Sequence, residues 1–249
     1  MNAPQCTAPT NRLLSVLSDR SRNRFLESCI HVELRFGEVL CNPGERVRHV
    51  YFPTDSFISL ITHLDDGARL EVGIVGDEGM LGTSLVLGVA MAPQYALVQG
   101  AGSALRMTTA VFQGHCRRSA VLRQHLDRYV YVLMSQVAQT AACTSFHTVD
   151  ARLARWLMTT VDRAHSSRFH LTHEFLAYML GVRRVGITKA AGSLQTRGLI
   201  SYSRGEINVH DAAALERAAC SCYRQARNLY EKILGAPPGR APGIDRAQC

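Results

Sequence analysis

Long apolar runs are missing from this 249-residue sequence. No stretch approaches the ~18 consecutive apolar residues that a membrane-spanning helix needs, and no charged and then apolar leader opens the chain. Charged residues make up only 19% of the chain and hydrophobic residues 47%, a balance that excludes wholesale disorder. We therefore expect a soluble, cytoplasmic protein with no membrane partner and one or two folded domains.

Motifs of catalytic chemistry are also missing. The sequence has no P-loop and no recognisable Ser/His/Asp set. A cupin-like metal enzyme would need a His-x-His pair, whereas His31, His49 and His63 are isolated. We therefore predict that the protein is not an enzyme.

The eight cysteines are scattered, and only Cys220 and Cys222 lie close together. A zinc site would require two more ligands at short spacing, and the neighbouring sequence offers none. If both cysteines belong to one helix, their side chains point in different directions. We expect ordinary packing rather than metal binding or redox sensing, and we predict no metal site.

The chain has an excess of positive charge. It contains 28 Lys and Arg against 20 Asp and Glu, for a formal net charge of +8 and a pI near 9.3. Such a balance favours a polyanionic partner such as nucleic acid.

Residues 11–118 have the pattern of many short strands. Phe57–Leu64 and Arg69–Val75 are β-prone runs on either side of Asp65-Asp66-Gly67, which is a hairpin signal. Further short runs follow a glycine-rich stretch, so we predict an antiparallel β-roll, and an α+β protein overall. Residues 1–10 and 235–249 are predicted to be flexible tails.

Residues 119–147 switch to helical periodicity without proline or glycine. A helix of about seven turns in a protein of this size often packs against a copy of itself, so we predict a dimerisation helix. The predicted contact stripe consists of Leu122, Leu126, Tyr129, Leu133, Gln136 and Thr140.

Residues 148–234 are predicted to form a winged helix-turn-helix. A helix capped by Thr172 ends at Gly181, a second runs from Arg183 to Arg197, and a hairpin turns at Arg204-Gly205. We expect the second helix to be buried through Val185, Ile187, Leu194 and its alanines. Its exposed cations then point toward a DNA major groove.

Each candidate DNA contact has a proposed role. Arg184 is placed to contact a guanine, while Arg183 and Lys189 reach bases or phosphates. Thr172 and His173 are expected to bind a phosphate at the start of the first helix, and Arg204 to meet the backbone at the wing tip.

The segment LTHEFLAYMLGVRRVGITKAAGSLQTRGLI resembles the helix-turn-helix of the Crp/Fnr family of bacterial transcription regulators. The order of roll, long helix and winged helix is also similar to that family, from about Leu13 to Val209. The recognition helix of the family usually opens with Ser-Arg-Glu, where this chain has Arg183, Arg184 and Val185. The resemblance implies a homodimer that binds a site of two-fold symmetry on double-stranded DNA. It also implies that the dimer contacts RNA polymerase in some cases.

The resemblance also locates a candidate effector pocket at Glu78, Gly79, Met80, Leu81 and Gly82, which resemble the family's phosphate cassette. Met80 aligns with the family's ribose-binding Glu, and the phosphate position falls near Pro93-Gln94, with no Arg between Arg69 and Arg106. We therefore predict that cyclic AMP does not bind in the usual way. Glu78 is either a substitute ribose contact or a solvated loop carboxylate. The spacing of Cys6, Cys29 and Cys41 also argues against the iron–sulfur cluster of some relatives, so no cofactor is assigned.

The sequence thus predicts a homodimeric regulator that binds DNA. Two alternatives stay open. The roll could be a degenerate scaffold on a constitutive DNA-binding protein, or the chain could be a sensor module that acts mainly by binding another protein.

Overall fold

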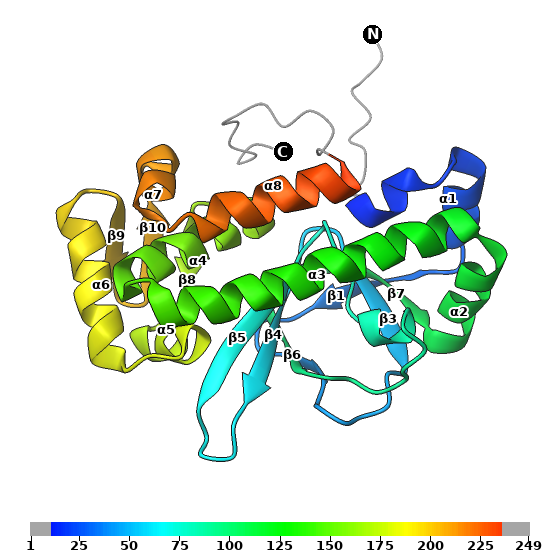
Figure 1. The fold of residues 1–249 in the computed structure, drawn as a ribbon, viewed down its shortest axis with the longest axis horizontal. Helices are drawn as coiled ribbons and strands as arrows, with labels where there is room; N and C mark the ends of the chain where they lie inside the picture. The colour runs from blue at the N-terminus through cyan, green and yellow to red at the C-terminus, as the bar shows by residue number, and fades with distance from the viewer. Residues whose placement is uncertain (1–10, 236–249) are drawn as a thin grey trace, which may run out of the picture.

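The computed structural model describes residues 11–235 and contains two antiparallel sheets in its N-terminal half (Figure 1). One sheet has the strand order β1-β7-β3, and the other has the order β2-β6-β4-β5. A 3-10 helix η1 (Arg12–Val16) and helix α1 (Asp19–Leu26) precede them. The strands are β1 (Ile30–Leu34), β2 (Val39–Cys41), β3 (His49–Pro53), β4 (Phe57–His63), β5 (Arg69–Val75), β6 (Tyr95–Gly100) and β7 (Gly102–Thr108), with a 3-10 turn η2 (Thr83–Leu85).

The predicted antiparallel roll and α+β class are confirmed. Strands β4 and β5 form the expected hairpin, with His63 opposite Arg69 and Gly67 at φ +84° in the turn. An α-L conformation of this kind costs glycine little, because it has no Cβ to clash with the backbone.

The C-terminal half is mainly helical. Helices α2 (Thr109–Arg118), α3 (Ala120–Phe146) and α4 (Val149–Ala164) follow the roll. Ser119 caps the 27-residue helix α3 by accepting a hydrogen bond from the Leu122 amide at 3.2 Å. The remaining elements are β8 (Arg168–His170), α5 (His173–Leu180), α6 (Arg184–Thr196), β9 (Ile200–Ser203), β10 (Glu206–Val209), α7 (Ala212–Ala218) and α8 (Cys222–Leu234).

Helix α3 runs along the molecule, with strands on one side and α8 beside it (Figure 1). Leu122, Leu126 and Tyr129 are at most 4% exposed and belong to the core of the roll. Thr140 is also buried, while Leu133 and Gln136 are half-buried. Our prediction that this stripe contacts a second copy is therefore wrong for its buried members, because the chain's own roll and helices cover them.

A different side of α3 is exposed. Tyr131 is 56% exposed and Met134 65%, and Ala138 and Ala141 continue the same side at helical spacing. Phe146, at the end of the helix, is 84% exposed. Large apolar side chains of this kind are candidates for contact with a partner.

Helix α8 lies between the two halves of the fold. Its Tyr230 hydroxyl donates to the Glu78 carbonyl oxygen at 2.8 Å, and Leu234 packs against the core of the roll. Gly235 caps the helix and is the one residue of the two predicted tails that the structure describes. Within residues 11–235, no helix is both long enough and apolar enough to cross a membrane.

Our assumption that Cys220 and Cys222 belong to one helix and point apart is wrong. Cys220 precedes α8, Ser221 is the cap, and Cys222 is the first helical residue. Both cysteines are buried in one cluster with Cys143 from the end of α3.

Candidate nucleic-acid interface and β-roll cavity

A helix-turn-helix is formed by α5, a tight turn and α6. The Thr172 hydroxyl accepts a hydrogen bond from the Phe175 amide at 3.1 Å and so caps α5. Gly181 ends α5 at φ +61°, and α6 begins only three residues later with Arg183 as its N-cap. A Cβ at Gly181 would lie 3.1 Å from Leu70 Cδ1 of the roll, so the turn requires glycine for both its conformation and its packing.

Helix α6 has one buried face and one exposed cationic end. Its buried face consists of Ile187, Ala190, Ala191 and Leu194. Arg183, Arg184 and Lys189 are all exposed, as the sequence predicts. Val185 is 60% exposed, so its predicted burial is wrong. The period of α6 instead places Val185 beside the two arginines, where an apolar side chain can contact a thymine methyl group.

The wing is formed by the sheet β8-β10-β9. Arg204 and Gly205 have φ values of +51° and +84°, as a two-residue type I′ hairpin requires. The Arg204 side chain is exposed at the tip. The turn therefore presents a cation on the exposed end of the hairpin.

His173 lies in a groove of about 430 Å³ between α6 and the wing. Its ring stacks on Tyr202 at 4.2 Å between centroids, and its Nδ1 lies 3.1 Å from the Thr188 hydroxyl oxygen. Burial, followed by the charge of Arg184, lowers the pKa of His173, so the ring is neutral at physiological pH. His173 therefore joins α5, α6 and β9. Of the two predicted phosphate contacts, Thr172 is exposed and His173 is half-buried.

A cavity of about 350 Å³ lies inside the roll. Met80, Leu81 and Gly82 of the predicted effector pocket line it, whereas Glu78 and Gly79 do not. Gly79 instead packs against Tyr129, since a Cβ there would lie 2.1 Å from the phenolic oxygen. Of the five residues predicted for an effector pocket, the C-terminal three therefore line a cavity.

Polar groups on several segments line the same cavity. Pro93 and Gln94 are among its lining residues. Arg46 and Arg48, from the segment before β3, also line it. These two cations lie outside the stretch between Arg69 and Arg106, and they reach the cavity from a different part of the chain.

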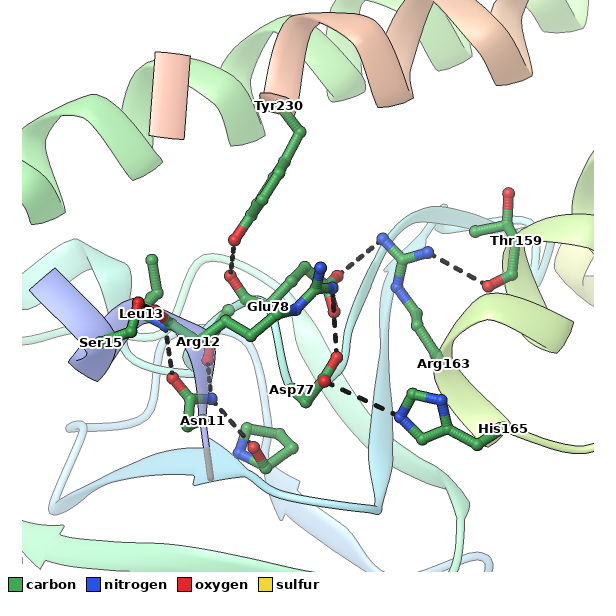
Figure 2. A network of polar contacts seen from close by, with 12 residues as sticks. Asn11, Arg12, Leu13, Ser15, Asp77, Glu78, Thr159, Arg163, His165 and Tyr230 are labelled. Carbon is green, nitrogen blue, oxygen red and sulfur yellow. Dashed lines mark hydrogen bonds and ion pairs between the residues drawn. The ribbon is translucent and has the colours of Figure 1, made fainter. Parts of the chain in front are cut away.

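Glu78 faces the C-terminal half of the fold (Figure 2). Its Oε1 lies 2.7 Å from Arg163 Nη2 on α4, and the carboxylate is 7% exposed. Neither expectation for Glu78 is therefore correct, because it contacts neither the cavity nor bulk solvent. Arg12 adds a longer contact of 3.9 Å to Oε2, and a buried carboxylate requires such cationic partners.

Neighbouring residues make further polar contacts around the Glu78–Arg163 ion pair. Asp77 lies 3.2 Å from Arg12 Nη2 and 3.7 Å from His165 Nε2, just beyond α4 (Figure 2). Arg163 Nη1 also donates to the Thr159 carbonyl at 3.1 Å. Residues from η1, the glycine-rich loop and α4 thus meet in one polar network.

Comparisons with known proteins agree with this geometry. Residues 151–218 match the model of the Crp-like helix-turn-helix domain. No curated protein matches the chain significantly.

Solved structures match over most of the chain. FixK2 from Bradyrhizobium japonicum has a TM-score of 0.65 at 14% identity, covering 77% of this chain and 98% of its own. CLP, the c-di-GMP-responsive global regulator of Xanthomonas campestris, has a TM-score of 0.64 at 14% identity. The match covers 78% of this chain and 100% of the CLP chain. A CRP-family transcriptional regulator of Thermus thermophilus has a TM-score of 0.62 at 20% identity. The match covers 76% of this chain and 96% of that regulator's chain. The chain therefore has the fold of Crp/Fnr-family transcription regulators, and its residues 151–218 belong to the Crp-like helix-turn-helix domain family.

Proposed function

We propose that this protein is a transcription regulator in the cytoplasm that binds double-stranded DNA through α6 and its wing. The observation that carries the proposal is the exposure of Arg183, Arg184 and Lys189 on a helix whose opposite face is fully packed. Arg184 is positioned for a bidentate contact to guanine, and Arg183 and Lys189 for bases or phosphates. Thr172 and Arg204 flank this helix as phosphate contacts.

The regulator acts as a homodimer on a two-fold site. The exposed apolar side of α3 at Tyr131, Met134, Ala138 and Ala141 supports this assembly, because a second copy of α3 would cover it. Two recognition helices related by that axis read half-sites about one DNA turn apart, ~34 Å. RNA polymerase is a further proposed partner at regulated promoters.

Gel-shift titration against genomic fragments selected by the protein tests DNA binding. We expect salt-dependent, sequence-specific binding that Arg184→Ala weakens by about 1–3 kcal/mol. Arg20→Ala is the matched control, because Arg20 is an exposed arginine on α1 of the roll. Absence of binding to any fragment would contradict the proposal and favour the alternative of a sensor that binds another protein.

The effector is proposed not to be cyclic AMP bound in the manner of the family. Glu78, the candidate substitute for the ribose contact, is engaged with Arg163 and does not line the cavity. The absence of an Arg between Arg69 and Arg106 no longer supports the proposal, because Arg46 and Arg48 line the cavity from another segment, so the proposal rests on Glu78. Calorimetry with cyclic AMP and cyclic GMP tests this, and micromolar binding of either nucleotide would contradict it.

A further inference from the structure

Four metal-ligating side chains converge where α3 ends and α8 begins. Cys143 lies in the last turn of α3, and His147 follows as its C-cap. Cys220 and Cys222 flank the start of α8. The three sulfurs and one ring nitrogen all lie within 4.8 Å of one another.

Two of the separations between these atoms match those of a tetrahedral ion site. Cys143 Sγ lies 3.5 Å from Cys220 Sγ, and Cys222 Sγ lies 3.5 Å from His147 Nδ1. Ligands about 2.3 Å (sulfur) and 2.0–2.1 Å (nitrogen) from a tetrahedral Zn²⁺ are ~3.5–3.8 Å apart. Sulfurs that hold an iron–sulfur cluster bind different irons and stand wider apart.

The surroundings of the cluster also fit a metal. Cys143 and Cys222 are fully buried and Cys220 is 8% exposed, whereas His147 is half-buried, so the three sulfurs are shielded from water. The Gln139 side chain donates to Cys222 Sγ at 3.0 Å from the preceding turn of α3. A hydrogen bond to a ligating sulfur orients it and stabilises its thiolate form.

Charge provides an independent argument. Arg152 on α4 is only 7% exposed, yet the ion pairs found among residues 11–235 do not include it. Its guanidinium donates to the Leu180 carbonyl and interacts electrostatically with Cys143 and Cys220. Buried arginines are rarely left without a counter-charge. Zn²⁺ with three thiolates and a neutral histidine carries one net negative charge, opposite in sign to Arg152 and to Arg155, whose charge also acts on Cys143 and Cys220.

We propose that Cys143, His147, Cys220 and Cys222 bind one structural Zn²⁺ ion that joins the α3–α4 junction to α8. Binding converts three thiols to thiolates and releases three protons to solvent, so charge balances. With four protein ligands the ion has no open position, as in structural rather than catalytic zinc sites. The DNA-binding helices attach to α3 through this junction, so the ion fixes the point where the two halves of the fold meet. All four ligands lie outside residues 151–218, and the site is independent of the proposed DNA binding.

Elemental analysis of the untagged full chain, purified under reducing conditions without chelator, tests the proposal. We expect about one zinc per chain. Replacement by Co²⁺ should give the visible absorption of a tetrahedral, thiolate-rich centre. Zinc should raise the melting temperature of the metal-stripped chain, because a ligand of the folded state stabilises it.

Variants assign the ligands. Cys222→Ser and His147→Gln should lose the stoichiometric metal and the Co²⁺ spectrum, whereas Cys116→Ser, a half-buried cysteine of α2, should keep both. Gln139→Leu should keep the site and weaken zinc affinity about tenfold. The Co²⁺ spectrum of the wild-type chain stands as a test even where a ligand variant fails to fold. A metal-free chain without that spectrum, a Cys143–Cys220 disulfide in the reduced preparation, or bound iron would each overturn the proposal.

Discussion

The indole nitrogen of Trp156 donates to Glu71 Oε1 at 2.8 Å, joining α4 to β5. Ser59 on β4 donates to the other carboxylate oxygen at 2.6 Å. Glu71 is 7% exposed, and burial raises its pKa to about 7 despite these hydrogen bonds. The contact between the roll and the first helix of the DNA-binding part therefore contains a carboxyl group that titrates near physiological pH.

Glu71→Gln should remove a pH-dependent part of the folding stability. Since the folded pKa lies above the unfolded value of about 4.5, the folded state binds more protons between these values. The contribution of Glu71 to the free energy of unfolding is fully present below pH 4.5 and is lost as the pH rises to about 7. The loss is on the order of 3 kcal/mol. Urea unfolding from pH 5 to 8 measures it.

The matched control for that series is Glu174→Gln, which changes an exposed carboxylate on α5. Its stability curve should run parallel to the wild type, whereas the Glu71→Gln curve should fall less with pH. Parallel curves for both variants would show that Glu71 has no raised pKa.

Arg163→Met should destabilise the protein by about 3–5 kcal/mol, because it leaves Glu78 buried beside only the distant Arg12. The double variant Arg163→Met/Glu78→Gln should lose less than the sum of the single variants, since the unpaired charge is gone. Denaturant unfolding of the four proteins measures this coupling, and strictly additive losses would argue against a direct pair.

Met134→Glu should convert the proposed dimer to a monomer, because it places a charge at the centre of the exposed apolar side of α3. Sedimentation velocity at micromolar concentration measures the mass. Leu64→Glu is the control, since Leu64 is 60% exposed at the end of the β4–β5 hairpin. A wild-type monomer, or a dimeric Met134→Glu variant, would refute the proposed interface.

Arg204→Ala should weaken DNA binding to all sequences about equally, since the wing cation is a proposed phosphate contact. The slope of log K against log salt should become shallower by about one per bound half-site. Binding of selected and scrambled duplexes across a salt series measures both effects. A loss confined to the selected duplex would instead assign Arg204 to base reading.

Local patterns were sufficient to predict much of the architecture. The Asp65-Asp66-Gly67 turn, the long helix and the turn at Gly181 each depend on a few adjacent residues, so their signals survive in the sequence. The exposed cations of α6 were predictable for the same reason, since helical period separates them from Ile187 and Leu194.

Long-range packing explains the errors. Periodicity identifies Leu122 and Leu126 as apolar but does not reveal that the roll of the same chain covers them. Glu78 was misjudged because Arg163 is 85 residues away, and the partners of Cys220 and Cys222 lie more than 70 residues upstream. Val185 was misassigned because a hydrophobic residue was assumed to be buried.

The placement of Glu78 and Met80 on one short loop has a mechanical consequence. Met80 forms part of the wall of the roll cavity, and two residues earlier the Glu78 carboxylate holds α4. Only Gly79 separates the cavity wall from the residue that contacts α4, so three consecutive residues connect the roll cavity with the C-terminal half. We expect a molecule that displaced Met80 to act on this ion pair first.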